Sequence, residues 1–390
     1  MDTEENLFEE FAGVSKEAWL AKAEKDLRGK PLSDLEWQLG EDLSVAPFYH
    51  PDDMEHPPTP LWQGRAQNQW ELGELIEVND LPGANSALRE GLEGGAEAPL
   101  LILHHEPGEE ELDELFDGVE LSFISTHFTQ FYPGKQPGQL LRQFVEWTKK
   151  RKRNTGKLAG SIDYDPILDW NAPPFATLVE TMNFARKELP QWRVLQINGL
   201  RFHAGPENAS QELALIIAKG SEYLAQLQER DIESAQANEQ LQFTVALSTS
   251  YFVDIAKLRA LRLLWNNVLQ AYGAPAADIC VVAHLARETQ GDDPNTNMIK
   301  AGTQAMSAVI GGARRLYIRP ADFSFNQPST AFTRRIARNV QHILRMESYL
   351  DRVIDPAAGS YYIEKLTEKL AEQAWTQFKH LEAEEAFRSA

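Results

Sequence analysis

Cysteine is almost absent from this sequence, since Cys280 is the only one among 390 residues. An intrachain disulfide is therefore impossible, and zinc sites built from several cysteines are excluded. Cys280 lies in the apolar run "DICVVAHL". A cysteine in such a run is expected to be a buried and unreactive thiol.

Long apolar runs and basic charge are scarce as well. No stretch approaches the about 20 apolar residues of a membrane-spanning helix. The acidic start "MDTEENLFEEF" lacks the cationic segment and apolar core of a signal peptide. Lys and Arg number 38 against 58 Asp and Glu, and the net charge of −20 disfavours nucleic acid and anionic membranes as partners. We therefore expect a cytoplasmic globular protein. The basic run at 149–153 is expected to be a solvated helix end.

The first 60 residues differ in character from the rest and predict a separate arm. "VSKEAWLAKAEKDLRG" has the pattern of a short amphipathic helix, and "SVAPFYHPDDMEHPPTP" is proline-rich and extended. The arm is too short to bury its large apolar side chains by itself, so they must lie against the barrel or against a partner. These side chains are Trp19, Leu20, Phe48 and Tyr49.

From residue 72 onward, short apolar runs alternate with helical patterns. The eight predicted strands are 72–78, 99–105, 120–126, 159–165, 194–199, 243–248, 279–285 and 315–320. Eight such units predict an α/β fold, a (β/α)₈ barrel spanning residues 61–352. An open doubly wound sheet would carry a glycine-rich turn after its first strand, and "EVNDLPGANS" is not one. Residues 353–390 then predict a corner and a C-terminal helix.

Polar residues at the carboxyl ends of the predicted strands are the candidates for chemistry. They include His104, His127, Asp163, Asp165, His203 and His284. One hypothesis is a metal-dependent hydrolase that uses the rim histidines. Asp163 and Asp165 are separately a possible acid–base pair, although two such aspartates before Pro166 more often form a turn. The spacing is not typical of metal ligands, however, and we predict no metal site. The sequence also contains no "GxSxG", phosphate-binding loop or "HExxH".

Several longer stretches carry a more specific signal. They are "ELALIIAKGSEYL", "YFVDIAKLRALRLLWNNV", "NTNMIKAGTQAMSAVIGGARRLYIRP" and "FTRRIARNVQHILRMESYLDRVIDPAAGSYYIEKLTEKLAEQAW". In order and spacing, over about residues 155–380, they resemble the adenosylcobalamin-dependent acyl-CoA mutases, methylmalonyl-CoA mutase above all. The family core is a (β/α)₈ barrel. "VSKEAWLAKAEKDLRGKPLSDLEW" and "APFYHPDD" are similar to one branch, the small subunits of two-chain bacterial mutases.

The resemblance implies that this branch pairs with a large catalytic subunit, which the apolar side chains of the arm contact, and that it does no chemistry itself. Catalytic members carry an adjacent Tyr-His after the fifth strand, and those positions fall on Leu200 and Arg201 here. Leucine has no hydroxyl and arginine is permanently charged, so neither can substitute. A slip of one or two residues would bring His203 nearer. Ala283 stands where the arginine that helps hold acyl-CoA is expected.

Two further sequence features, the missing cobalt-ligating motif and the side chains along the barrel axis, also indicate a non-catalytic chain. The "DxHxxG" whose histidine would ligate cobalt does not occur, so we expect no cobalamin-binding flavodoxin-like domain in this chain. Adenosylcobalamin would be held by the partner subunit. Alternate side chains of a strand face the barrel axis, and both possible sets are bulky on two strands. They are Leu100 and Ile102 or Leu101 and Leu103 on strand two, and Leu316 and Ile318 or Tyr317 and Arg319 on strand eight. We therefore predict a closed, packed axis.

The leading hypothesis is thus a non-catalytic small subunit of a heterodimeric mutase that converts methylmalonyl-CoA to succinyl-CoA. Two alternatives remain open from the sequence. The chain could be a catalytic acyl-CoA mutase barrel that uses a cobalamin domain on a separate chain. More distantly, it could be the metal-dependent hydrolase.

Overall fold

The computed structural model of the protein describes residues 13–40, 43–54, 61, 65–323 and 329–387. Its centre is a sheet of parallel strands in the order β7-β6-β5-β4-β3-β11-β10-β9-β8. The strands are β3 (Glu71–Val78), β4 (Ala98–Leu103), β5 (Ser125–Gln130), β6 (Ala159–Ile162), β7 (Gln191–Arg193), β8 (Leu195–Asn198), β9 (Leu241–Leu247), β10 (Val281–Leu285) and β11 (Arg315–Tyr317).

The sheet closes into a barrel through β7 and β8. Only Val194 separates these two strands, and both belong to one stretch of chain. The first half pairs with β6 and the second half pairs with β9. Counting them as one strand gives eight strands within the described residues, so the predicted (β/α)₈ barrel is confirmed.

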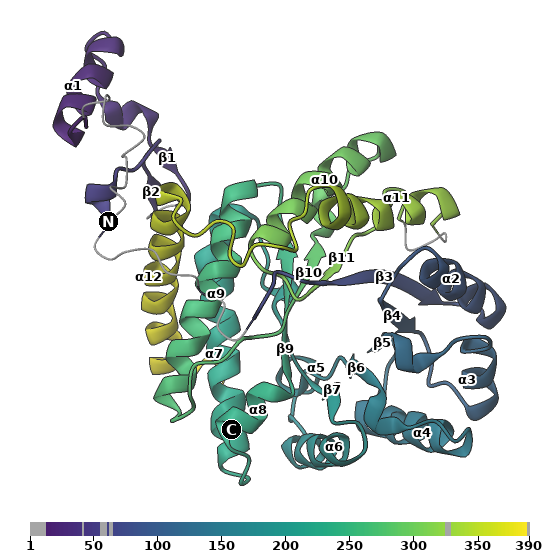
Figure 1. Ribbon diagram of the computed structural model, residues 1–390. Coiled ribbons are helices and arrows are strands. Elements are labelled where there is room, and N and C mark those ends of the chain that lie inside the picture. The colour runs from purple at the N-terminus through teal and green to yellow at the C-terminus, as the bar shows by residue number, and fades with distance from the viewer. Residues whose placement is uncertain (1–12, 41–42, 55–60, 62–64, 324–328, 388–390) are drawn as a thin grey trace, which may run out of the picture.

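Helices surround the barrel in the order that the sequence pattern predicts (Figure 1). The helices after the arm are α2 (Leu81–Glu93), α3 (Glu109–Leu115), α4 (Pro137–Lys150), α5 (Pro166–Asp169), α6 (Phe175–Glu188), α7 (Ala209–Gln228), α8 (Ser234–Glu239), α9 (Tyr251–Ala271), α10 (Pro294–Ile310), α11 (Ala331–His342) and α12 (Tyr361–Ala383). Short 3₁₀ turns lie at η3 (Leu121–Phe123), η4 (Thr155–Lys157), η5 (Gly199–Arg201), η6 (Pro206–Asn208) and η7 (Arg287–Thr289), and a π-helical turn, η8 (Ile343–Glu347), follows α11. Within the described residues, no helix is long and apolar enough to cross a membrane.

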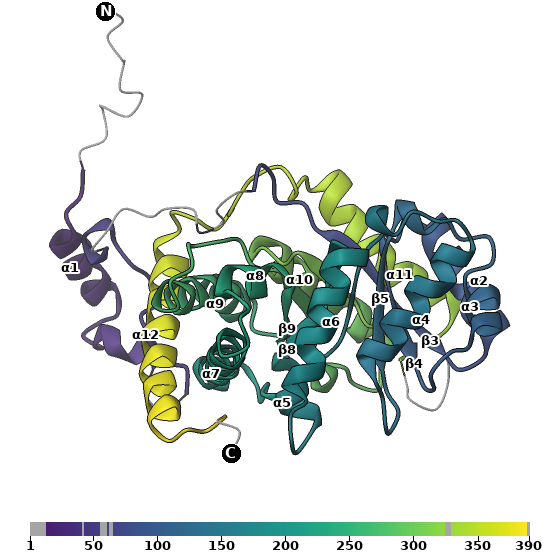
Figure 2. The ribbon, with the colours of Figure 1, turned by 90° about the horizontal axis from the view of Figure 1, so that it is seen from below.

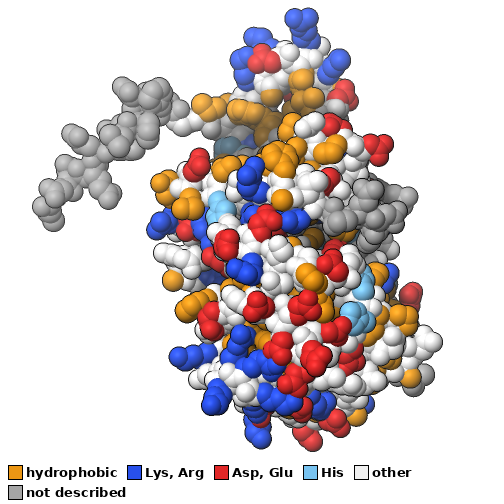
Figure 3. Space-filling model, turned by 90° about the vertical axis from the view of Figure 1, so that its right-hand side faces the viewer, with side chains coloured by type: hydrophobic (Ala, Val, Ile, Leu, Met, Phe, Trp, Pro, Cys, Tyr) orange, Lys and Arg blue, Asp and Glu red, His pale blue; other side chains and the backbone are white. Residues whose placement is uncertain are grey.

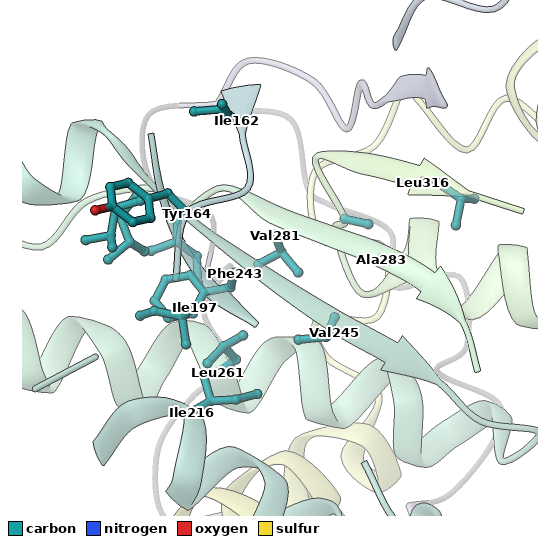
Figure 4. Close-up of a cluster of buried hydrophobic side chains, with 14 of the residues drawn as sticks. Ile162, Tyr164, Ile197, Ile216, Phe243, Val245, Leu261, Val281, Ala283 and Leu316 are labelled. Carbon is teal, nitrogen blue, oxygen red and sulfur yellow. The ribbon is translucent and has the colours of Figure 1, made fainter. Parts of the chain in front are cut away.

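The main hydrophobic core lies between the strands and the helices. Phe243 and Val245 of β9 and Ala283 of β10 face Ile216 of α7 and Leu261 of α9 (Figure 4). Since successive side chains of a strand point to opposite faces, their neighbours point into the barrel. A separate cluster of Leu100, Cys280, Val282 and Tyr317 lies on this inner side. The buried thiol is as predicted.

The third strand is displaced from its predicted position. The prediction placed it at 120–126, but β5 begins at Ser125 and ends at Gln130. Residues 121–123 form η3 instead, where the Glu120 side chain accepts hydrogen bonds from the Ser122 amide and hydroxyl. The prediction was wrong because β5 carries polar residues, His127 and Thr129, toward the barrel axis, so it lacks an apolar pattern.

The corner after α11 joins the barrel to α12. Asp355, in a left-handed backbone conformation (φ 44°), forms an ion pair with Arg259 of α9, which also contacts Glu364 of α12 at 2.8 Å. Leu61 donates its backbone N–H to Asp355 Oδ2 at 3.1 Å. α12 then lies across α7 and α9 (Figure 2). The corner therefore fixes α12 and the start of the barrel chain to α9.

The arm lies on the outer side of α12. It consists of α1 (Lys16–Asp26), η1 (Leu32–Leu35), the antiparallel pair β1 (Trp37–Gln38) and β2 (Ser44–Val45), and η2 (Pro51–Asp53). Leu39, Leu43 and Val45 are buried in the main core, whereas α1 has no buried residue. α1 stands apart from the barrel in both ribbon views (Figures 1 and 2).

Candidate functional site

The middle of the barrel axis is filled by side chains of the barrel itself. Tyr317 lies over Gly73, where an added Cβ would come within 2.5 Å of the tyrosine ring. The inward side chains at this level are at most 6% exposed: Leu100, His127, Ser161, Gln196, Thr244, Val282 and Tyr317. A channel along the axis would expose these side chains to water. The predicted closed axis therefore agrees with the structure. Leu100 of strand two and Tyr317 of strand eight are the side chains that face the axis.

The filling of the axis is largely polar and hydrogen-bonded. Arg315 Nε lies 2.8 Å from Glu71 Oε2, and Ser125 donates to the same carboxylate at 2.6 Å. Gln242 donates to Asp163 Oδ1 at 3.1 Å. Such networks make a core rigid when their members are satisfied. The bonded groups are therefore structural partners of one another.

Two histidines of this network are held in the neutral state. His127 Nδ1 lies 2.8 Å from Ser161 Oγ, and burial, together with the charge of Arg315, lowers the pKa of His127 well below 6.5. His284 lies against the ring of Tyr317, with ring centroids 4.8 Å apart. Burial, with the charges of Arg319 and Arg315, lowers the pKa of His284 to about 3.

Asp163 directly follows β6 in this network and is half-buried. Burial raises the pKa of its carboxyl to about 6, and the Thr129 hydrogen bond and the charge of Arg315 oppose that shift in part. A carboxyl with such a pKa could exchange protons near neutral pH. Its recorded hydrogen-bond partners are the side chains of Gln242, Gln196 and Thr129, two amides and a hydroxyl, and none of these is a general base.

The predicted acid–base pair of Asp163 and Asp165 does not form. Asp165 points out of the barrel, where Lys219 Nζ lies 2.6 Å from one carboxylate oxygen and the Tyr223 hydroxyl donates to the other at 2.6 Å. The Asn198 backbone N–H donates to Asp165 as well, at 2.8 Å. The prediction assumed one continuous strand, but β6 ends at Ile162 and Asp165 is already the N-cap residue of α5.

The other predicted rim residues do not form a metal site. His104 is exposed and pairs with Glu77 at 2.8 Å, whereas His127 lies in mid-strand deep inside the barrel, so its placement on the rim was wrong. In the part of the chain that the structure describes, no three His, Cys, Asp or Glu side chains come together as metal ligands. The hydrolase hypothesis gains no support from this geometry.

His203 is engaged in a buried charge network. Its Nδ1 lies 2.8 Å from Glu212 Oε2, and its Nε2 lies 3.0 Å from Glu288 Oε1. Glu212 also pairs with Lys257 at 3.1 Å. Only 3% of the His203 side chain is exposed. The histidine that a shifted alignment would bring nearer to the reaction thus holds together η5, α7 and η7.

The remaining positions of interest are simpler. Leu200 and the exposed Arg201 lie in η5, directly after β8. Ala283 faces the helices, so a side chain there cannot reach the axis (Figure 4). The basic run ends α4 as expected, where Lys149 pairs with Glu188 and Lys150 with Glu109, both at 2.5 Å.

Sequence reasoning missed Lys219, Lys257 and Arg315 as network members. Lys219 and Lys257 each interrupt an otherwise apolar helical stripe, in "LALIIAKG" and "FVDIAKLRAL". A charged residue on a buried helix face requires a partner, and this signal could have identified both. Arg315 carries no such signal because it begins a short strand.

Comparison with known proteins now places the chain. The family model described as methylmalonyl-CoA mutase matches residues 108–389. The chain belongs to the methylmalonyl-CoA mutase family. It is 31% identical to the methylmalonyl-CoA mutase small subunit of Porphyromonas gingivalis, over 99% of this chain and 66% of that protein. It is 29% identical to the small subunit of Streptomyces virginiae, over 97% of this chain and 65% of that protein.

A relative without the small-subunit name is similar to nearly the same degree. The methylmalonyl-CoA mutase of Cereibacter sphaeroides is 29% identical over 94% of this chain and 58% of its own length. The chain therefore spans between 58% and 66% of the length of these methylmalonyl-CoA mutase relatives. The family model matches within the barrel and the C-terminal helix, and the relatives extend the similarity to 94–99% of the chain.

Proposed function

We propose that this chain is the small, non-catalytic subunit of a heterodimeric, adenosylcobalamin-dependent methylmalonyl-CoA mutase. The complex would interconvert methylmalonyl-CoA and succinyl-CoA, with the chemistry in the large subunit. This chain would stabilise and position that subunit. The naming of several similar proteins as small subunits supports the assignment.

The filled axis is the observation that carries the non-catalytic role. An acyl-CoA arm that entered this barrel would have to displace Tyr317 and Leu100, which are 1% and 6% exposed. Replacing that packing would cost about 3–5 kcal/mol for the tyrosine alone. The axis therefore supports a structural barrel rather than a substrate channel.

The sequence lacks the "DxHxxG" motif whose histidine would ligate cobalt in this family. At the barrel top, both ring nitrogens of His203 already lie against carboxylates, those of Glu212 and Glu288. These two observations support assigning the cofactor to the partner subunit, and we derive no chemical step for this chain.

The catalytic alternative, in which a separate chain supplies the cobalamin domain, is less well supported. It would require His203 or an equivalent residue to contact the thioester carbonyl. His203 would first have to break its contacts with Glu212 and Glu288. Leu200 and Arg201 offer neither a phenol nor an imidazole.

The arm supplies the surface for the partner. Val14, Leu35 and Trp37 are 64%, 49% and 41% exposed, and Trp19 is 39% exposed. Large apolar groups in such exposure are typical of protein interfaces. Among the predicted partner contacts, Trp19, Leu20 and Phe48 remain candidates. Tyr49 instead packs on Tyr362 of this chain, with ring centroids 6.0 Å apart.

The experiment is reconstitution with the large mutase subunit from the same source. The two purified chains should co-elute, and mutase activity should require the large subunit. Exchanging His203 for Gln in this chain should leave the turnover of the complex unchanged. If the His203→Gln complex is folded, paired and inactive, the non-catalytic assignment fails. If the two chains do not pair, the subunit assignment itself fails.

A further inference from the structure

The arm is attached to the body of the molecule through α12. Lys369 Nζ donates to the backbone oxygen of Ser44 at 2.6 Å and lies 5.9 Å from the centroid of the Tyr49 ring. Tyr49 in turn packs on Tyr362, at the first turn of α12. The buried side chains of Leu39, Leu43 and Val45 join the same core. Seen from the side of α2 and α11, the arm projects above the body of the molecule (Figure 3).

α1 is held onto this base rather than onto the barrel. Lys16 forms an ion pair with Asp53 of η2, and Trp19 packs edge-on against Phe48. η2 is itself fixed, since His50 N–H donates to Asp53 Oδ2 at 2.8 Å. A continuous series of contacts thus leads from α12 through β2 and η2 to α1, although α1 buries none of its own residues.

We propose that α12 holds the arm in its bound position before the partner subunit binds. We call the contacts of Lys369 and Tyr362 with the arm the mount. Lys369 and Tyr362 would then act as positioning residues, which control the affinity for the large subunit without contacting it. A surface that is held in its bound position loses less conformational entropy on association, so it binds more tightly. This inference rests on the proposed function, because the partner is the large mutase subunit.

The test compares variants of α12 that do or do not touch the arm; Tyr362 also packs on Phe252 of α9, with ring centroids 5.4 Å apart, so the stability of each variant is measured as well. Lys369→Ala and Tyr362→Leu remove the mount, and Lys379→Ala removes an exposed lysine of the same helix as the matched control. The double mount variant should bind the large subunit about tenfold more weakly in a titration, while the control binds like the unmodified chain. The melting temperature of each isolated chain reports whether the barrel is intact.

A second measurement does not depend on the partner. Amide hydrogen exchange in α1 of the isolated chain should be slowed in the unmodified protein and in Lys379→Ala, and should accelerate in the double mount variant. Two results would overturn the mount: equal affinity for both kinds of variant, or α1 exchange that is already unprotected in the unmodified chain. If the unmodified chain does not pair with the large subunit, the proposed function is refuted. The hydrogen-exchange measurement then still tests whether α12 holds the arm in position.

Discussion

Lys219 Nζ lies 2.6 Å from Asp165 Oδ2, and neither side chain is exposed to solvent by more than 2%. The pair joins α7 to the turn after β6, and Tyr223 and the Asn198 backbone complete the hydrogen bonds of the carboxylate. A buried ion pair of this kind is weak support for stability by itself. Removing one partner, however, leaves an uncompensated charge in the core.

The first prediction concerns this pair. Lys219→Met should lower the unfolding free energy by about 3–5 kcal/mol, because the Asp165 carboxylate stays buried without its counter-charge. Lys187→Met, on the exposed surface of α6, is the matched control and should change little. Denaturant titration measures both. The further exchange Asp165→Asn should recover part of the loss, and equal stabilities of the two methionine variants would contradict the assignment.

The second prediction uses the pKa of Asp163, which burial raises from 3.8 to about 6. The folded state binds this proton more tightly than the unfolded state does. The contribution of Asp163 to stability is therefore fully present below about pH 4 and is lost as the pH rises through about 6. Asp163→Asn keeps an acceptor for Gln242 without the charge. Its melting temperature should exceed that of the unmodified chain at pH about 8.

The pH series provides the control for this prediction. The advantage of Asp163→Asn should shrink steadily as the pH falls from about 8 to about 4, because the native carboxyl becomes neutral in the folded state. Other carboxyl groups titrate over the same range in both proteins, so only the difference between the two melting temperatures is informative. A difference that does not change with pH would show that Asp163 titrates with an ordinary pKa.

The strands, the barrel and the arm could be predicted from the sequence because their signals are local. Apolar runs such as those of β4, β9 and β10 mark strands on their own. β5 could not be placed this way, since its inward residues His127 and Thr129 are polar. They are tolerated there because His127 pairs with Ser161 and Thr129 donates a hydrogen bond to Asp163, both from the neighbouring strand segment. That pairing exists only once the barrel has closed.

The candidate site was harder to predict than the fold. On strands two and eight, both alternating sets of side chains are bulky. The sequence therefore indicated a filled axis but not which side chains fill it. The structure selects Leu100 and Tyr317. Asp165 and His203 looked like rim chemistry because each follows a strand. The role of Asp165 is decided by Lys219, which is 54 residues away and comes close only after α7 packs on the barrel. The role of His203 is decided by Glu212, which is nine residues away on the first turn of α7.

The third prediction addresses ligand binding by the isolated chain. Calorimetric titration with methylmalonyl-CoA and with adenosylcobalamin should show no binding, because the axis is filled and the sequence lacks the cobalt-ligating "DxHxxG" motif. The large subunit, titrated in the same buffer, is the positive control. Micromolar binding of either compound by this chain would favour the catalytic barrel with a separate cobalamin domain.

The fourth prediction locates the docking element of the arm. A deletion of residues 1–50 would remove Leu39, Leu43 and Val45 from the main core, so loss of pairing after that cut could reflect damage to the barrel. A deletion of residues 1–36 avoids this, because α1 and η1 contain no buried residue. The shortened chain should melt within a few degrees of the full chain, since about 1 kcal/mol shifts melting by roughly 2–4 °C in a large domain.

The same shortened chain should nevertheless pair poorly with the large subunit. It lacks Val14, Trp19 and Leu35, and burying each such side chain at an interface contributes about 1.5–3 kcal/mol. The loss of even one of these contacts corresponds to at least tenfold weaker association. Co-elution at micromolar concentration and the melting temperature are measured on the same preparation. Unchanged pairing would show that the docking surface lies on the barrel, and an unfolded product would show that α1 supports the body of the molecule.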